Sequence, residues 1–353
     1  STTADINLQL GTGGLALANN LTAADDVRLD TTGAITQTAG IITAANLGVR
    51  SQSDVSLTRN NLVSTNFAAA AHDVTFNNAS TGLLTIGTVG SITNFFGTSG
   101  LGDSGVTTIT TSGALSVTST SNSDGGLNLK SSGLLTLNAI MGASAGAVRF
   151  VSSGGINQVG SIIGGVDLSA VNTGSGDILL MGSNNFTGNF AANNAVAGGL
   201  VKYRNAFGSS ITVGTVAAGP GTFGAVSGIT ASSGDVTLQG KILTINQAIN
   251  AGTGVIRLRT DGGISQGASG TIVGSALGIR NGTSGAIDLS GTGNNVATVA
   301  MSDSFTGGTI KYRDTNAVNI GSVSAESIAF VFDALDGVVA TDGTFTLVAG
   351  GAL

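Results

Sequence analysis

Short segments of the chain alternate between hydrophobic and polar residues, and each ends in Gly, Asn, Asp or Ser before the alternation resumes. In "GVIRLRT", Ile256 and Leu258 lie on one side of an extended chain, while Arg257 and Arg259 lie on the other. A period of two residues is typical of a β-strand with one buried face. The pattern therefore predicts many short β-strands separated by tight turns.

Hydrophobic phrases also repeat at long range. "GAITQTAG" contains Ile35, "GGINQVGS" contains Ile156 and "GGISQGAS" contains Ile264, and glutamine follows each isoleucine at the next position but one. A second phrase comes later in each copy, as "LTIGTV", "ITVGTV" and "VNIGSV". Because the spacings differ, we expect insertions in loops on one face, for example around Pro220. The predicted modules of one continuous solenoid are roughly residues 1–120, 121–230 and 231–353.

The amino-acid composition strengthens the β prediction. Charged residues make up 9% of the chain, against about 25% in an ordinary globular protein. Glu326 is the only glutamate among 19 acidic residues, and aspartate favours turns whereas glutamate favours helices. The 57 glycines come with one proline and no cysteine, which argues against collagen and excludes disulfide bonds. The hydrophobic share of 41% argues against disorder.

Short, evenly spaced strands fit a sandwich, a barrel or a solenoid. Two features favour the solenoid: the chain repeats itself, and aromatic residues, which are common in globular β-cores, make up only 4%. The predicted fold class is therefore all-β, a parallel β-helix or β-solenoid in which each coil stacks on the next. With a rise of ~4.8 Å per coil, roughly fifteen coils would form an elongated rod on the order of 70 Å long.

The repeats resemble those of a known family. "GGINQVGSIIG", "GSSITVGTV" and "GTIKYRDTNAVNIGSV" are similar to the β-strand repeats of filamentous-haemagglutinin-like exoproteins of two-partner secretion and of autotransporter passengers. The resemblance covers nearly the whole chain and is one of repeat style. It implies a right-handed β-helix in a secreted surface protein of a diderm bacterium, with this chain as an interior repeat region or a trimmed product. The Asn-Pro-Asn motifs of the family's secretion domain have no counterpart, since Pro220 is the only proline.

Charge and composition narrow the function classes. The net charge of −6, with scattered basic residues, gives no footprint for nucleic acid, and no apolar run approaches the roughly 20 residues of a membrane helix. The resemblance implies an adhesin-like protein of the extracellular cell surface, and we expect it to be non-enzymatic, with surface glycans or host receptors as partners and with no cofactor or metal. The alternative is a subunit that assembles with itself, head to tail, into a filament or surface layer. A glycan-cleaving enzyme is a third hypothesis, and it requires two close, buried carboxylates.

Candidate catalytic or metal-binding residues are few. Two acidic groups could bind calcium or act as an acid–base pair, but we interpret their members as turn residues beside Gly or Ala. His72 adjoins Asp73, and because adjacent strand residues point to opposite faces, we expect no catalytic pair there. The acidic groups are Asp25, Asp26 and Asp30, and Asp333, Asp336 and Asp342.

The most distinctive polar motif is Lys-Tyr-Arg, which occurs twice. Alternation places Lys and Arg on one strand face and Tyr on the other. One interpretation is a basic surface that binds acidic glycans or another anionic polymer. The other is a solvated strand face whose tyrosine fills a corner of the core. The candidate surface-binding residues are Lys202, Arg204, Lys311 and Arg313.

Two further features concern assembly and modification. The run "SIAFVFDALDGVV" is more apolar than the rest of the chain, and we expect a cap, an assembly junction or a truncation point there, with Phe330 and Phe332 as its contacts. Asn-x-Ser/Thr sequons leave glycosylation open. They begin at Asn20, Asn78, Asn185 and Asn281.

Overall fold

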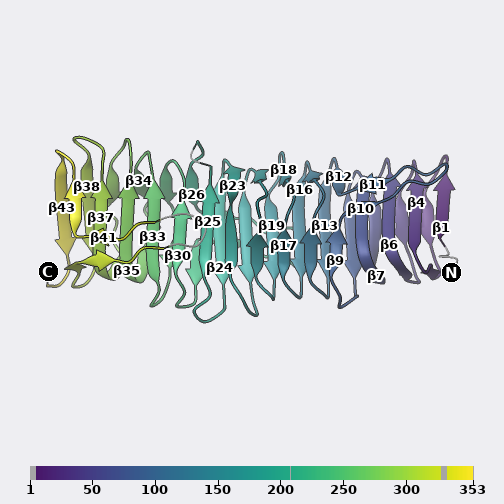
Figure 1. The fold of residues 1–353 in the computed structure, drawn as a ribbon, viewed down its shortest axis with the longest axis horizontal. Coiled ribbons are helices and arrows are strands. Elements are labelled where there is room, and N and C mark those ends of the chain that lie inside the picture. The colour runs from purple at the N-terminus through teal and green to yellow at the C-terminus, as the bar shows by residue number, and fades with distance from the viewer. Residues whose placement is uncertain (1–4, 207, 327–331, 353) are drawn as a thin grey trace. The chain divides into compact units, whose positions relative to one another are not determined.

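The computed structural model of the protein describes residues 5–206, 208–326 and 332–352. These residues form 43 β-strands and no helix, and most strands pair in parallel (Figure 1). The chain makes about 15 turns of a parallel β-solenoid, which confirms the predicted fold class and number of coils. The handedness of the coils and the length of a rod stay predictions.

The chain divides into two compact units. The first comprises residues 1–166 and 219–223, and the second comprises residues 167–218 and 224–353. Residues 219–223 therefore belong to the first unit, although their neighbours along the chain on both sides belong to the second. The predicted module boundaries near residues 120 and 230 stay predictions.

In the first unit, parallel strands stack in register, so that each hydrophobic side chain lies on its counterpart in the next coil. Phe76, Ile109, Leu129 and Phe150 form one such core row, and each is fully buried. The residues between them along each strand face outward. The four strands are β8 (Val74–Asn78), β13 (Val106–Thr111), β16 (Gly126–Ser131) and β19 (Val148–Ser152).

The second unit is built in the same way. Tyr203, Leu238, Leu258, Ile279 and Met301 are paired in register across five strands, and all are at most 1% exposed. These strands are β25 (Val201–Asn205), β30 (Val236–Gln239), β33 (Val255–Thr260), β35 (Ile272–Asn281) and β37 (Asn295–Asp303).

The repeated glutamine closes the same corner in each copy. It ends a short strand, β5 (Ile35–Gln37), β20 (Ile156–Gln158) or β34 (Ile264–Gln266). Its side-chain amide then donates to a backbone carbonyl just beyond the strand, that of Gly40 (3.1 Å), Ser161 (2.9 Å) or Gly270 (2.8 Å). A polar residue recurs here because the chain turns and leaves backbone carbonyls that need donors.

The second repeated phrase, "GTV" or "GSV", begins an antiparallel hairpin inserted into one strand position of a coil. The strands on either side of the first hairpin, β9 (Leu84–Ile86) and β12 (Leu101–Asp103), both pair with β7 (Val55–Ala71). The other two hairpins are inserted in the same manner, next to β24 (Asn189–Asn194) and β37. The first hairpin is β10 (Thr88–Val89) with β11 (Thr98–Ser99), the second is β27 (Thr215–Val216) with β28 (Val226–Ser227), and the third is β40 (Ser322–Val323) with β41 (Leu335–Asp336).

Two glycines form the neck of each hairpin. The amide of Gly100 donates to the carbonyl of Gly87 at 2.7 Å, and Gly228 and Gly337 donate in the same way to Gly214 and Gly321 at 2.8 Å. The three donor glycines have φ angles of 64°, 68° and 71°. This left-handed conformation returns the chain to the coil, and glycine adopts it without steric cost.

Candidate functional site

The first hairpin lies on the outer face of the first unit, in a space made by a glycine. A Cβ atom placed on Gly48 would lie 3.1 Å from the Cβ of Val89, a buried residue of the hairpin strand β10. Arg28 holds the hairpin further along, because its Nε donates to the carbonyl of Gly90 at 3.0 Å. The same guanidinium is paired with Asp26 and, at 3.0 Å, with Asp5. The hairpin is therefore fixed by packing and by charge-assisted hydrogen bonds.

The third hairpin repeats this arrangement in the second unit. Val323 and the ring of Phe332 occupy the space that a side chain on Gly278 would need. Arg257 donates to the carbonyl and the hydroxyl of Ser324 at 3.0 and 2.9 Å, and its other terminal nitrogen lies 2.7 Å from Asp235. Arg257 thus corresponds to Arg28.

The tip of the second hairpin, residues 219–223, belongs to the first unit and packs within it. Gly219 faces the side chain of Arg149, since a Cβ placed on it would lie 2.9 Å from the Cδ of that arginine. Lys130 donates to the hydroxyl of Thr222 at 3.0 Å. The segment around Pro220 is therefore the tip of a hairpin that has a counterpart in all three copies, and it does not account for the difference in their spacings. The arginines that contact the three hairpins, Arg28, Arg149 and Arg257, all follow the same pattern in the sequence, "VRL", "VRF" and "IRL". Strand alternation alone predicts only that these arginines face outward.

The two Lys-Tyr-Arg motifs differ in their surroundings. Tyr203 and Tyr312 face the core and are 1% exposed, as predicted. Lys202 is only 2% exposed, and its Nζ lies 2.6 Å from Oε1 of Glu326. The prediction of a surface-binding role is therefore wrong for Lys202, because Glu326, near the third hairpin's tip, covers it.

The other three basic residues of these motifs lie at or near the surface. Arg204 is half-buried and donates to the carbonyl of Gly182 and the hydroxyl of Ser183. Lys311 and Arg313 are exposed, and Lys311 lies 3.7 Å from a carboxylate oxygen of Asp288. Their role in binding an anionic polymer stays a prediction.

Phe332 is an anchor of the third hairpin. It is fully buried in a cluster with Met181, Ala300, Val323 and Leu335. The guanidinium of Arg280 lies 5.9 Å from the centre of its ring. A buried ring on the side of the unit is not free to contact a second molecule, so the assembly role predicted for Phe332 is wrong. Phe330 lies outside the described residues.

The first hairpin carries the most exposed large hydrophobic residue among those the structure describes. Phe96 is 73% exposed, and the guanidinium carbon of Arg50 lies 4.9 Å from its ring centre. Ile92, on the same hairpin, is 40% exposed. Beside this surface is a hollow of about 340 Å³, lined by Gln9, Asp30 and Arg50 among others. An aromatic ring held on an arginine and open to solvent is typical of a recognition surface.

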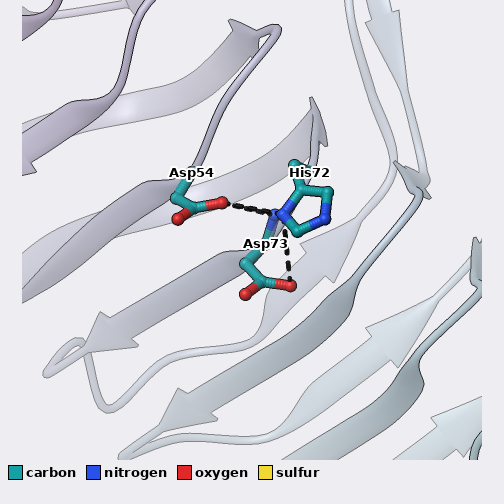
Figure 2. A group of neighbouring side chains, drawn as sticks. All are labelled: Asp54, His72 and Asp73. Atoms are coloured by element: carbon teal, nitrogen blue, oxygen red, sulfur yellow. Dashed lines mark hydrogen bonds and ion pairs between the residues drawn. The ribbon is translucent and has the colours of Figure 1, made fainter.

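His72 and two carboxylates meet at the turn between β7 and β8, as Figure 2 shows. Nδ1 of His72 lies 2.9 Å from Asp54 and 3.7 Å from Asp73. The hydrogen bond to Asp54 and the charge of Asp73 raise the pKa of His72 above its usual value. The expectation that His72 and Asp73 point to opposite faces is wrong, because both lie in the turn and not in a strand.

The ligand atoms of this cluster lie within 4.8 Å of one another, as a metal site requires. Asp73, however, already accepts the amide of Val106 at 2.5 Å, and Asp54 accepts both His72 and the amide of Asp73. The three side chains are about half exposed. We interpret the cluster as a hydrogen-bond network that ties successive coils together.

Asp103 is a buried carboxylate on β12. Burial raises its pKa to about 7, and the negative charge of Asp73 acts in the same direction. Hydrogen bonds from the hydroxyl of Thr107 and the amide of Ala71 oppose this shift. Its oxygens thus satisfy neighbouring donors. A pKa near neutrality is typical of a general acid. A glycan-cleaving site, however, needs two close, buried carboxylates, and Asp73, the carboxylate whose charge acts on Asp103, is half exposed.

The first acidic group singled out in the sequence converges in part, because ligand atoms of Asp25 and Asp26 lie within 4.8 Å of one another and of Asp5. Asp26 joins Asp5 at the guanidinium of Arg28, whereas Asp30 accepts from Gln9 at 3.2 Å. In the C-terminal group, Asp336 accepts the hydroxyl of Ser322, Asp333 lies 3.9 Å from Arg280, and Asp342 has a left-handed φ of 50°. Asp25, Asp333 and Asp342 lie outside the strands, in agreement with their interpretation as turn residues. That interpretation is wrong for Asp26 and Asp30, which lie in β4, and for Asp336, which lies in β41.

The sequons differ in accessibility. Asn78 and Asn281 are 3% and 2% exposed, and their amides bond within the coils. Asn20 and Asn185 are exposed. Glycosylation stays a prediction for these two and conflicts with burial at the other two.

Comparison of the chain with protein-family models, with curated proteins and with solved structures finds no match. The resemblance to filamentous-haemagglutinin-like repeats therefore stays a prediction, while the β-solenoid itself is established by the fold. None of the described residues belongs to a helix that could span a membrane.

Proposed function

We propose that this chain is a non-enzymatic, adhesin-like β-solenoid of the extracellular cell surface, whose inserted hairpins carry the recognition surfaces. The observation that carries the proposal is the first hairpin, on which Phe96 is 73% exposed above Arg50. Covering this large exposed ring with a partner would remove apolar surface from water, which favours binding. The clamp from Arg28 and the packing of Val89 on Gly48 order the hairpin before any partner arrives, which reduces the entropy lost on binding.

The test is binding of the purified chain to immobilised extracellular-matrix proteins and to a glycan array. We expect binding that Phe96→Ser weakens about tenfold or more, as for a central aromatic contact. The matched control is Phe305→Ser, which removes another exposed phenylalanine (38%) from a turn in the second unit and should leave binding unchanged. Absence of binding to every surface, or equal loss in both variants, would overturn the proposal.

Head-to-tail self-assembly is a second candidate. Among the described strands, β1 (Ile6–Leu10) pairs only with β4 (Asp26–Thr31), and β43 (Thr344–Ala349) pairs only with β38 (Thr309–Asp314). Both outer edges therefore carry unpaired backbone groups that a further strand, from this chain or from a second copy, can pair with. Electron microscopy across a dilution series tests the idea. Filaments that lengthen with concentration support it, and discrete particles at every concentration exclude it.

A further inference from the structure

Within the first unit, Pro220–Phe223 and the outward faces of β8 and β13 line a groove of about 520 Å³. Its floor is formed by Thr75 and Asn77 of β8 and by Thr108 and Thr110 of β13. Pro220–Phe223 and Lys130 form one wall. The volume lies within the range of about 300–1,000 Å³ in which proteins bind small ligands.

The polar groups of the floor form a regular grid. Thr75 pairs with Thr108, and Asn77 pairs with Thr110, in neighbouring parallel strands. Paired residues are therefore ~4.8 Å apart, and alternate residues along one strand are roughly 7 Å apart. The grid combines hydroxyl and amide groups, which both donate and accept hydrogen bonds, with the methyl groups of threonine.

Several of these groups are available to a ligand. Within the described part of the chain, the hydroxyls of Thr75 and Thr110 and the side-chain amide of Asn60 make no hydrogen bond to protein. Lys130, by contrast, is engaged with Thr222 at 3.0 Å. No carboxylate lines the groove, and Lys130 is its only charged residue. A ligand for this surface needs many hydroxyl groups, apolar C–H faces and little charge.

We propose that this groove binds a neutral oligosaccharide. The inference rests on the proposed recognition function, and it adds a site and a ligand class at a second hairpin, distinct from Phe96. The wall is ordered in advance, because Lys130 fixes Thr222 and the ring of Pro220 restricts the backbone of the tip.

The test is titration of the purified chain with neutral hexasaccharides of glucose, mannose and N-acetylglucosamine, followed by calorimetry and saturation-transfer NMR. We expect at least one to bind with a Kd below about 1 mM. The double variant Thr75→Val, Thr110→Val should weaken it about tenfold or more, because two hydrogen bonds are lost while the shape is kept. The matched control is Thr136→Val, at a half-buried strand position in the first unit outside the groove, which should bind like the parent.

Each other outcome overturns the proposal. If no neutral hexasaccharide binds while Phe96-dependent binding persists, the groove is not a glycan site and the proposed recognition function stands. If neither occurs, both proposals fail. If a heparin hexasaccharide competes for the groove and binds more tightly, the ligand class is wrong. Binding that survives the double variant places the sugar elsewhere.

Discussion

Lys202 and Glu326 lie 124 positions apart in the chain, and their side chains meet at 2.6 Å in a buried ion pair. The pair joins strand β25 to the third hairpin. Because removing one partner leaves a buried charge unpaired, we expect Glu326→Ala to cost about 3–5 kcal/mol of hairpin stability. Hydrogen exchange and limited proteolysis of residues 322–336 measure this, and both should show the hairpin opening more often.

The second Lys-Tyr-Arg motif offers a matched control. Lys311 and Asp288 are 53% and 45% exposed and lie 3.7 Å apart. Exposed pairs contribute at most about 1 kcal/mol, so Lys311→Met should leave exchange and proteolysis nearly unchanged. Comparable effects of Glu326→Ala and Lys311→Met would show that the pair of Lys202 does not hold the hairpin.

The stability lost when a glycine of a hairpin neck is replaced by alanine should depend on how closely other atoms surround that glycine. A Cβ on Gly100 would lie 1.9 Å from the carbonyl oxygen of Thr120 at a φ of 64°. Gly337 has a φ of 71° but open space around it. We expect Gly337→Ala to cost about 1–3 kcal/mol from backbone strain alone, and Gly100→Ala to cost more.

Gly102 provides the control for these substitutions, because it lies in β12 with open space and no left-handed φ. Gly102→Ala should change the free energy of unfolding by less than about 1 kcal/mol. Urea denaturation of the three variants gives the order. A Gly100→Ala variant as stable as Gly102→Ala would contradict the close packing of the neck.

The two tyrosines should respond in opposite ways to loss of their hydroxyl. The hydroxyl of Tyr312 donates to Asp314 at 2.6 Å, whereas the buried hydroxyl of Tyr203 has no partner among the described residues. Tyr312→Phe should cost about 1.5–3 kcal/mol, because it removes a hydrogen bond to a charged group. Tyr203→Phe should be neutral or stabilising. Thermal unfolding distinguishes the two, and an equal loss of stability would show that Tyr203 has a partner.

Strand alternation was sufficient to predict the coils but not what covers them. In β33, Ile256 and Leu258 face the core as their spacing predicts. Arg257 has an outward position, yet it is only 3% exposed, because Ser324 lies over it. Contacts between residues this far apart follow from the path of an inserted hairpin, which periodicity does not encode.

The repeats were more informative about position than about role. They predict that Gln37, Gln158 and Gln266 are equivalent, and the structure gives all three the same bond to a turn carbonyl. They also mark where each hairpin begins. The expectation for His72 was wrong about local geometry. A turn replaces the expected strand there and brings the ring to Asp54.

Asp103 should make the protein less stable as the pH rises. Burial raises its pKa in the folded state to about 7, against 3.8 for an unperturbed Asp. The folded chain therefore binds the proton more tightly, so this stabilisation is complete below about pH 4 and lost between pH 4 and 7. At 1.4 kcal/mol per pKa unit, the loss is at most roughly 4 kcal/mol. Asp103→Asn should flatten the unfolding free energy over this range, whereas the exposed Asp124→Asn should not. If the unfolding free energy of Asp103→Asn depended on pH as strongly as that of the parent, Asp103 would not be the source of this pH dependence.

His72 provides the most direct test of the network in Figure 2, because it is the only histidine and gives a single imidazole signal in NMR. The hydrogen bond to Asp54 raises its pKa, and the charge of Asp73 adds to this. A cation favoured in the folded state stabilises it below the unperturbed pKa of 6.5, and this contribution disappears as the pH rises through the raised value. Titration of the ring signal should therefore give a midpoint above 6.5. Asp54→Asn should lower that midpoint more than Asp73→Asn, because it replaces the carboxylate acceptor of the hydrogen bond, the larger cause of the shift, by a neutral amide. The reverse order would mean that the ring points to Asp73 in solution.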